Sequence, residues 1–338
     1  MKKQIVAAAV AASMSAVALA DISITGAAKV NYTNIDTEGS APDTNRFTQE
    51  MDLKVKGKSG DTEVVINFGG AALDGDTSDG DGTFTAQDSI GGSMSGANKD
   101  SFMSVEDAYV STKIADVSIK TGTWDNGNNE LRASSRNAGK LQATTSIGSV
   151  NLGFLTSSAG ASAEEFTVGT TLGGVALSYT QKQTGETVKA STSFNGVNVK
   201  YLGLPSDTAN SDRDYIEVST KVGDMGVKVG SASAESATSL DGDTWLGDFE
   251  GNSSGSYALS NDQDILGIEL STSMAGNKVT YRNISVDGVS GEDTDINKFI
   301  VTRPLASGAT FELTYTDVDD QASGADSSTL DLELAVNF

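Results

Sequence analysis

Apolar and polar side chains alternate along residues 328–338, the C-terminal stretch of the chain. The apolar positions are Leu330, Leu332, Leu334, Val336 and Phe338. Asp331 and Glu333 lie between them on the other parity. A period of two residues is typical of a β-strand with one apolar and one polar face. The pattern alone does not distinguish a strand on a soluble core from a strand that faces lipid.

The same period returns along the whole chain and predicts a protein built from strands. We expect eighteen strands, at residues 22–32, 46–56, 63–68, 104–113, 117–123, 141–146, 150–155, 166–172, 175–181, 188–194, 197–202, 215–222, 227–233, 265–273, 278–284, 298–303, 310–317 and 328–338. Tight connections such as Asn195-Gly196, a strong hairpin signal, alternate with longer polar ones such as residues 69–100 and 234–264. Because single hairpins are easily misassigned, a count of sixteen stays open.

The alternation of long and short connections predicts a barrel in an outer membrane. Such barrels have tight turns at the periplasmic rim and long loops outside, whereas the loops of a soluble sandwich lack that order. Ile, Val, Leu, Phe, Tyr, Ala and Thr occupy the parity that we assign to the outside, and Lys, Glu and Asp gather on the other. In hydrocarbon a sheet must close so that every backbone amide is paired. The predicted fold is therefore all-β: a transmembrane antiparallel up-and-down β-barrel of 16 to 18 strands, with 18 favoured.

Aromatic residues near the ends of the predicted strands are expected to form girdles at the membrane interfaces. They are Tyr32, Phe68, Phe154, Tyr179, Phe194, Tyr201, Tyr215, Phe299 and Phe338. An even number of strands places both termini at the periplasmic rim. We therefore expect the C-terminal strand to pair with residues 22–32 and close the barrel.

Residues 1–20 have the layout of a cleavable secretory signal. Lys2 and Lys3 precede a run rich in Ala and Val, which ends in Ala18-Leu19-Ala20. The apolar run is too short to span a membrane comfortably. We expect residues 1–20 to be removed and residues 21–338 to form one barrel domain, located in the outer membrane of a Gram-negative bacterium.

Composition excludes several classes of function. The chain has 338 residues, no Cys, no His and a formal net charge of −23. It therefore has no thiol nucleophile, imidazole base or soft metal site, and we expect neither an enzyme nor a bound metal or cofactor. The acidic balance argues against nucleic acid, whose phosphates it repels. The acids of residues 74–81 lack the spacing of a calcium-binding loop, and acids in external loops lack the cleft of a glycosidase.

With these features the chain resembles the general diffusion porins of Gram-negative outer membranes. The resemblance rests on the Ala-Leu-Ala leader, the first strand D-I-S-I-T-G-A-A-K-V and the closing strand L-D-L-E-L-A-V-N-F, and it covers essentially the whole mature chain. It implies a homotrimer among outer-membrane lipid and lipopolysaccharide. The terminal Phe of these porins is read by the outer-membrane assembly machinery, and Phe338 matches that position.

The resemblance also implies a constriction, because the third external loop of these porins folds into the barrel. The matching segment by chain order is residues 124–139, which offers Asp125 and Glu130 as acids and Arg132 and Arg136 as bases. It is short and lacks the Pro-Glu-Phe-Gly type of sequence of many porins. In the family a basic wall faces such acids. The inward parity of this chain supplies Lys29, Arg46, Lys54, Lys56, Lys120, Lys200 and Lys221.

The expected function is passive diffusion of small hydrophilic solutes and ions through the barrel. The basic wall and the acidic loops act on ions in opposite directions, and the negative total favours a weak preference for cations. Two alternatives stay open. One is a substrate-specific outer-membrane channel, and the other is a secreted β-rich adhesin or surface-layer protein.

Overall fold

Each range that the sequence predicts as a strand is a strand in the computed structural model, apart from Phe338, which follows the last strand. The structure describes residues 21–38, 44–70, 103–125, 131, 136–158, 164–182, 185–205, 212–235, 238–241, 245–246, 256–259, 263–287, 293–320 and 326–338. The predicted signal at residues 1–20 lies outside this described part. The strands are β1 (Asp21–Thr37), β2 (Thr44–Ser59), β3 (Thr62–Gly70), β4 (Met103–Ile114), β5 (Val117–Asp125), β6 (Arg136–Ile147), β7 (Val150–Ser157), β8 (Glu165–Leu172), β9 (Val175–Lys182), β10 (Gly185–Phe194), β11 (Val197–Leu204), β12 (Arg213–Val222), β13 (Met225–Ala234), β14 (Thr238–Asp241), β15 (Ser256–Leu259), β16 (Gln263–Met274), β17 (Asn277–Val286), β18 (Thr294–Pro304), β19 (Ala309–Asp320) and β20 (Ser327–Asn337). Within the described ranges, no helix is long and apolar enough to cross a membrane.

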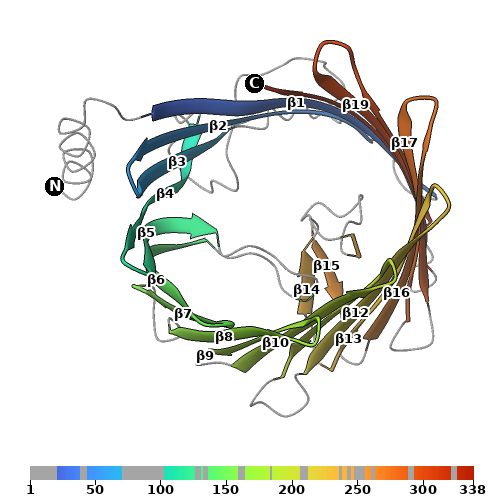
Figure 1. Ribbon diagram of the computed structural model, residues 1–338. Coiled ribbons are helices and arrows are strands. Elements are labelled where there is room, and N and C mark those ends of the chain that lie inside the picture. Colours follow the sequence, from blue (N-terminus) through green and yellow to red (C-terminus); the bar gives the residue numbers. More distant parts are fainter. Residues whose placement is uncertain are drawn as a thin grey trace.

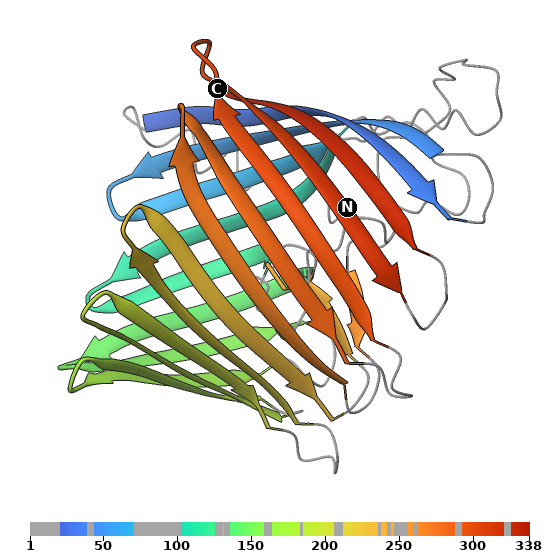
Figure 2. The same cartoon turned by 90° about the vertical axis from the view of Figure 1, so that its right-hand side faces the viewer.

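The sheet closes on itself. Each main strand pairs antiparallel with its neighbours in an 18-stranded sheet, and β20 returns to pair with β1 from Ala27↔Asn337 to Thr37↔Ser327. Figure 1 shows the resulting ring, and Figure 2 shows the tilt of its strands. Both the predicted barrel with 18 strands and the predicted closure by the C-terminal strand are confirmed. The lower count of sixteen is wrong, because all of the predicted hairpins form.

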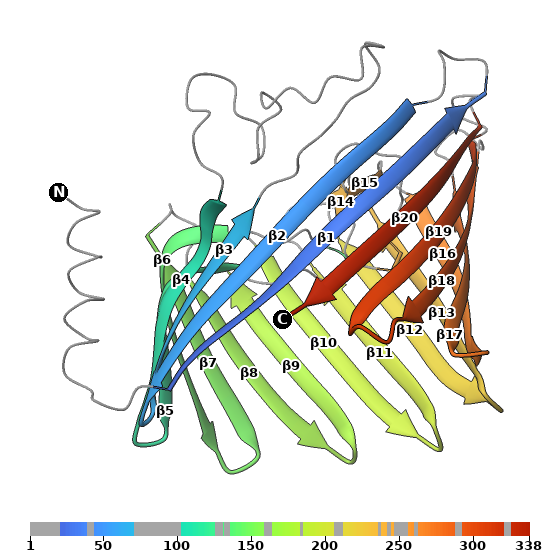
Figure 3. The same ribbon diagram turned by 90° about the horizontal axis from the view of Figure 1, so that it is seen from above.

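Tight turns alternate around the ring with connections that are mostly longer (Figure 3). The exception is the connection between β9 and β10, residues 183–184, which is as short as a tight turn. The turn between β10 and β11 illustrates how the sequence makes a tight turn. Asn195 and Gly196 both have positive φ, 51° and 81°, as a two-residue hairpin turn of type I′ requires. Asn tolerates this left-handed backbone better than most residues, and Gly adopts it freely. The Asn-Gly pair therefore fixes the register of this hairpin.

The two faces of the sheet differ as the alternation predicts. β14 and β15 lie inside the ring (Figure 1), and Trp245 and Leu246, between them in the chain, contact Gly230 of β13 and Gly267 of β16. Gly230 and Gly267 therefore lie on the inner face of the sheet. The pairing register then assigns the inner and outer positions of every other strand. Large apolar side chains such as Ile24 and Phe194, 61% and 73% exposed, lie on the outer parity. An outer face of this kind suits hydrocarbon.

Two tyrosines on the outer face donate hydrogen bonds to asparagines near strand ends that lead to long connections. Tyr32 donates its hydroxyl to Asn45 Oδ1 at 2.7 Å, and Tyr281 donates to Asn297 Oδ1 at 2.7 Å. An aromatic ring with a polar end suits a membrane interface. The prediction for Tyr215 is wrong: its side chain is fully buried on the inner parity, paired in register with Leu202. One residue of register decides which face a side chain takes, and the position of an aromatic near a strand end does not.

Replacing Ala190 or Ser191 by Arg tests the assignment of the two faces. These neighbours lie in the middle of β10, with Ala190 on the outer parity and Ser191 on the inner parity. An Arg at the bilayer midplane destabilises a membrane barrel by about 2–4 kcal/mol when it faces lipid. We expect Ala190→Arg to lower the free energy of unfolding by about that amount, and Ser191→Arg to leave it nearly unchanged because the side chain reaches water. Urea titration in lipid vesicles measures both, and equal losses contradict the assignment.

Candidate functional site

The register places all of the predicted wall residues on the inner parity. They are Lys29 on β1, Arg46, Lys54 and Lys56 on β2, Lys120 on β5, Lys200 on β11 and Lys221 on β12. Several inner acids lie beside them, including Glu50, Glu63 and Glu333. The inner face of β1–β5 is therefore a charged wall with both signs. The role of these residues in selectivity stays a prediction.

Two of the wall lysines form cross-strand ion pairs. Lys29 Nζ lies 3.7 Å from Glu50 Oε2, and Lys56 Nζ lies 2.6 Å from Glu63 Oε2. The Lys29 pair is well exposed, at 39% and 49% of the two side chains. Exposed ion pairs of this kind contribute only about 0–1 kcal/mol and exchange readily with water and ions. These charges therefore line the lumen without filling it.

Lys120 and Lys200 lie over aromatic rings instead. Lys120 Nζ lies 3.8 Å from the centroid of Tyr109 and 4.4 Å from that of Trp124, and the two rings meet edge to face. Lys140 supports the same cluster from β6: its buried ammonium donates to the backbone oxygen of Trp124 at 2.6 Å. On the other side of the lumen, Lys200 Nζ lies 5.6 Å from the ring of Tyr215. Cation–π contacts therefore hold these ammonium groups close to the wall.

The predicted constriction residues occupy the connection between β5 and β6 and the two strand ends that flank it. Asp125 is the last residue of β5, and Arg136, the first of β6, pairs with it in register. These two residues, predicted in a loop, belong to strands because the hairpin continues further than the apolar pattern indicates. Asp107 Oδ1 accepts the backbone N–H of Asp125 at 3.2 Å. Glu130 and Arg132 lie outside the described residues.

Leu131, midway along this connection, is anchored on a distant wall. Its side chain is fully buried in a cluster with residues of β11–β13 and β16–β18, and Arg213 Nη1 of β12 donates to its backbone oxygen at 3.4 Å. Figure 1 places β16 and β17 across the ring from β5 and β6. Leu131 therefore lies inside the barrel, held by contacts that the predicted charged set did not include.

A second segment inside the ring was not expected from the sequence. Residues 234–264 were predicted as an external acidic loop, but β14 and β15 pair as a short hairpin within the ring (Figure 1). Leu246 is fully buried, and Trp245 packs beside it. The prediction is therefore wrong for this part of the connection. The adjacent apolar pair Trp245-Leu246, in an otherwise polar and acidic stretch, is the signal that identifies the buried part.

Two segments are inserted into the barrel, one with Leu131 and the other with β14, Trp245, Leu246 and β15. Leu131 and Leu246 of these inserted segments meet in one apolar cluster. Its buried members are Leu131, Leu202, Tyr215, Ala232, Ala234, Leu246, Ile265, Ile284, Val286 and Ile296. The strand residues among them lie near the ends that lead into the long connections. One side of the lumen is therefore filled at that level, by packing that resembles the core of a soluble protein.

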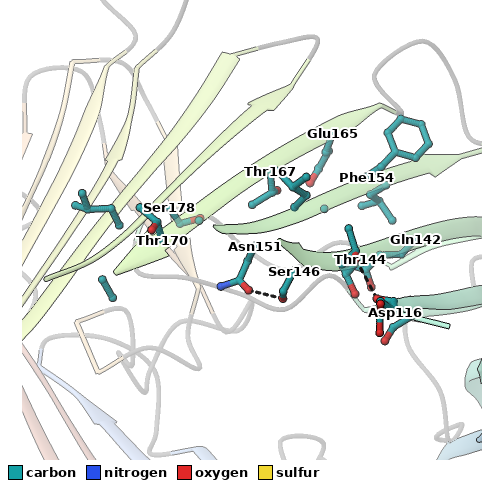
Figure 4. Close-up of a pocket in the computed structure, with 18 of the residues that line it drawn as sticks. Asp116, Gln142, Thr144, Ser146, Asn151, Phe154, Glu165, Thr167, Thr170 and Ser178 are labelled. Carbon is teal, nitrogen blue, oxygen red and sulfur yellow. Dashed lines mark hydrogen bonds between the residues drawn. The ribbon is translucent and has the colours of Figure 1, made fainter. Parts of the chain in front are cut away.

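The side of the lumen formed by β1–β9 contains two recesses. One, of about 700 Å³, follows β4–β9 and is lined largely by small polar side chains such as Gln142, Asn151 and Ser178 (Figure 4). Ser146 Oγ donates to Asn151 Oδ1 there, at 2.7 Å. The other, of about 680 Å³, lies against β1–β4 and includes Glu50 and Lys54. The open part of the lumen is therefore polar and lies beside the charged wall.

The described residues contain no group of three or more acidic side chains arranged to hold a metal ion. The polar lining and the charged wall instead favour contact with hydrated ions and small polar solutes, which need no fixed ligand geometry.

Phe338 closes the seam of the barrel at the end with tight turns. Gly26 N donates to Phe338 O at 2.8 Å, and Phe338 N donates to Gly26 O at 3.0 Å. A Cβ atom at position 26 would lie 2.5 Å from Cζ of the Phe338 ring. Glycine at this position therefore lets the ring lie over β1. The recognition of Phe338 by an assembly machinery stays a prediction.

The closed ring of 18 strands, apolar outside and polar within, is the fold of a porin barrel. No protein-family model and no curated protein matches the chain.

Solved structures match almost the whole chain. A BenF-like porin from Pseudomonas fluorescens Pf-5 is similar with a TM-score of 0.67 and 14% identity, over 94% of this chain and 98% of that one. Pseudomonas aeruginosa OccK5 (OpdH) gives a TM-score of 0.64 at 10% identity, over 94% and 98% of the two chains. Acinetobacter baumannii OccAB3 gives 0.60 at 10%, over 94% and 100%. At these identities the similarity establishes the fold.

Deleting Phe338 tests its place at the seam. The deletion removes the terminal ring and the backbone pair with Gly26. We expect less heat-modifiable barrel in the outer-membrane fraction, because β1 then has an unpaired edge near the seam. Phe194→Ala is a suitable control, since Phe194 is also an exposed outward phenylalanine beside a tight turn. Parental yield after the deletion contradicts the predicted role.

Proposed function

We propose that the protein is a passive channel of a Gram-negative outer membrane, through which small hydrophilic solutes and ions diffuse down their gradients. One observation supports this most directly: a closed sheet has an apolar outer face and an inner face that is polar and recessed along β1–β9. A sheet with that distribution of polarity is stable in lipid and keeps water inside. We also propose the homotrimer and the lipopolysaccharide contacts implied by the porin resemblance.

The outer face argues against a secreted adhesin or surface-layer protein. Large apolar side chains are exposed all around the barrel, from Ile22 and Ile24 on β1 to Leu334 and Val336 on β20. Soluble monomers rarely expose continuous apolar patches beyond a few hundred Å². A band of this extent is favourable in a bilayer and unfavourable in water.

The bases of the inner wall and the exposed acids beside the long connections together favour a weak preference for cations. Several inner bases are neutralised by neighbours: Lys29 and Lys56 have acidic partners, and Glu269 receives both Lys228, at 3.2 Å, and Arg282, at 2.7 Å. Exposed acids such as Asp287 and Asp326 add negative charge at the end of the barrel with the long connections. We propose that these acids attract cations to the mouth and that the remaining lysines keep the preference weak.

A substrate-specific channel is a second candidate, supported by the two inserted segments. They occupy one side of the lumen with an ordered apolar cluster. A narrowed passage with fixed side chains is a suitable place to bind one solute before releasing it. The two candidates predict different dependences of flux on concentration.

Solute flux into vesicles distinguishes the two candidates. We expect liposomes with the purified barrel to swell in small sugars and amino acids at rates that fall smoothly with solute size and rise linearly with concentration. A rate that saturates for one solute, together with block of ion current by that solute, indicates the substrate-specific channel. Vesicles that stay impermeable to every solute contradict both candidates.

The reversal potential in a salt gradient tests the proposed selectivity. We expect a weak cation preference that decreases with ionic strength, because the screening length falls from about 30 Å at 0.01 M to about 3 Å at 1 M. Lys54→Gln removes an exposed base from the inner wall and should increase the preference. Ser191→Gln adds an amide on the inner face without changing the charge and serves as the control. Clear anion selectivity of the parent protein contradicts the proposal.

A further inference from the structure

Two glycines face each other across β13 and β16 beneath the second inserted segment. Gly230 and Gly267 are paired in register on the inner face, and both are buried. A Cβ atom at position 230 would lie 2.5 Å from Cζ2 of Trp245. At position 267 it would lie 2.8 Å from Cζ3 of Trp245 and would also collide with Leu246. The paired glycines therefore form a notch in the wall, occupied by Trp245 and Leu246.

Polar contacts fix the indole of Trp245 in this notch. Its Nε1 lies 2.9 Å from Tyr215 Oη and 3.1 Å from Glu217 Oε2, and Tyr215 donates its own hydroxyl to Glu217 at 2.6 Å. Lys228 Nζ lies 4.8 Å from the ring centroid. The indole has a single N–H donor, and these oxygens satisfy it inside the barrel. The contacts select one position for the ring, which apolar packing alone does not do.

The notch also connects the two inserted segments. Leu246, held over Gly267, belongs to the same buried cluster as Leu131 of the β5–β6 connection. Tyr215, which contacts the indole N–H, is in that cluster as well. If Trp245 and Leu246 leave the notch, the shared cluster loses a close-packed neighbour. A cluster packed at the density of a core transmits such a loss to its other members.

We infer that the Gly230–Gly267 notch is a latch that positions both inserted segments, so that Trp245 and Leu131 together set the width of the lumen. Trp245, Gly230 and Gly267 are positioning residues: they act through the segments that they hold and need not contact the solute. The inference rests on the proposed channel function for its effect on permeation. The burial of Trp245 and of position 131 can be measured without measuring solute flux.

The fluorescence of Trp245 tests the latch directly. The chain has two tryptophans, so a Trp124→Phe background leaves Trp245 as the sole emitter. In this background we expect Gly267→Ala to shift the emission to longer wavelength and to increase quenching by acrylamide, because the added methyl displaces the ring. Gly169→Ala is the matched control: it adds the same methyl on the inner face of β8, where the nearest atom lies at an ordinary 3.5 Å. Equal spectra for both variants overturn the latch.

The accessibility of position 131 tests the coupling between the segments. The chain has no cysteine, so Leu131→Cys introduces a unique thiol at a fully buried position. We expect this thiol to react slowly with a maleimide in the parent and faster when Gly267→Ala is added, but not when Gly169→Ala is added. Heat-modifiable migration on gels confirms that each variant is a folded barrel. An unchanged rate with a shifted Trp245 emission overturns the coupling.

Conductance connects the latch to permeation. We expect Gly267→Ala and Trp245→Ala to raise single-channel conductance and current noise, and Gly169→Ala to match the parent. Parental conductance in both latch variants, with the Trp245 emission shifted in Gly267→Ala, overturns the effect on lumen width. Absence of current in every protein, including the parent, refutes the proposed channel, while the fluorescence and thiol results still decide whether the latch exists.

Discussion

The pairing of β20 with β1 is the contact on which the rest of the structure depends. A backbone amide without a partner costs several kcal/mol in hydrocarbon, so a sheet crossing a membrane has to leave no edge. Here β1 and β20, the first and last described strands, provide that last pairing, with the Gly26–Phe338 backbone contacts at its end. Since β1 and β20 are about 300 residues apart in the sequence, as in the Thr33–Asp331 hydrogen bond (|i−j| = 298), closure is a contact of very long sequence separation.

Closure creates two environments, and the alternation within each strand distributes side chains between them. The outer environment is apolar, and its tyrosines Tyr32 and Tyr281 donate hydrogen bonds to asparagines. The inner environment is uneven. On β11–β18 it contains an apolar cluster that holds two inserted segments, and on β1–β9 it contains polar recesses and a wall of both charges. In the proposed channel a solute passes beside the charged wall, because packed side chains occupy the other side.

The repeated period of two residues was sufficient to predict the eighteen strands, their alternating connections and the inner position of the lysine wall. It was sufficient because a strand between lipid and water has to alternate at nearly every position. The contacts of the connection between β5 and β6 were less predictable. The charged residues Asp125, Glu130, Arg132 and Arg136 drew attention, whereas an uncharged leucine, Leu131, anchors the segment. Two adjacent residues such as Trp245 and Leu246 show no alternation that predicts where they pack. Their position depends on Gly230 and Gly267, which lie in strands before and after them in the sequence.

Single-channel conductance of the purified protein in a planar bilayer is the most direct test of the central claim, that the closed barrel encloses a water-filled passage beside a charged wall. The account predicts stable unitary current steps in simple salts, with a conductance that increases with salt concentration. A protein that is folded by heat-modifiable migration and inserted in the bilayer, yet passes no current, contradicts it.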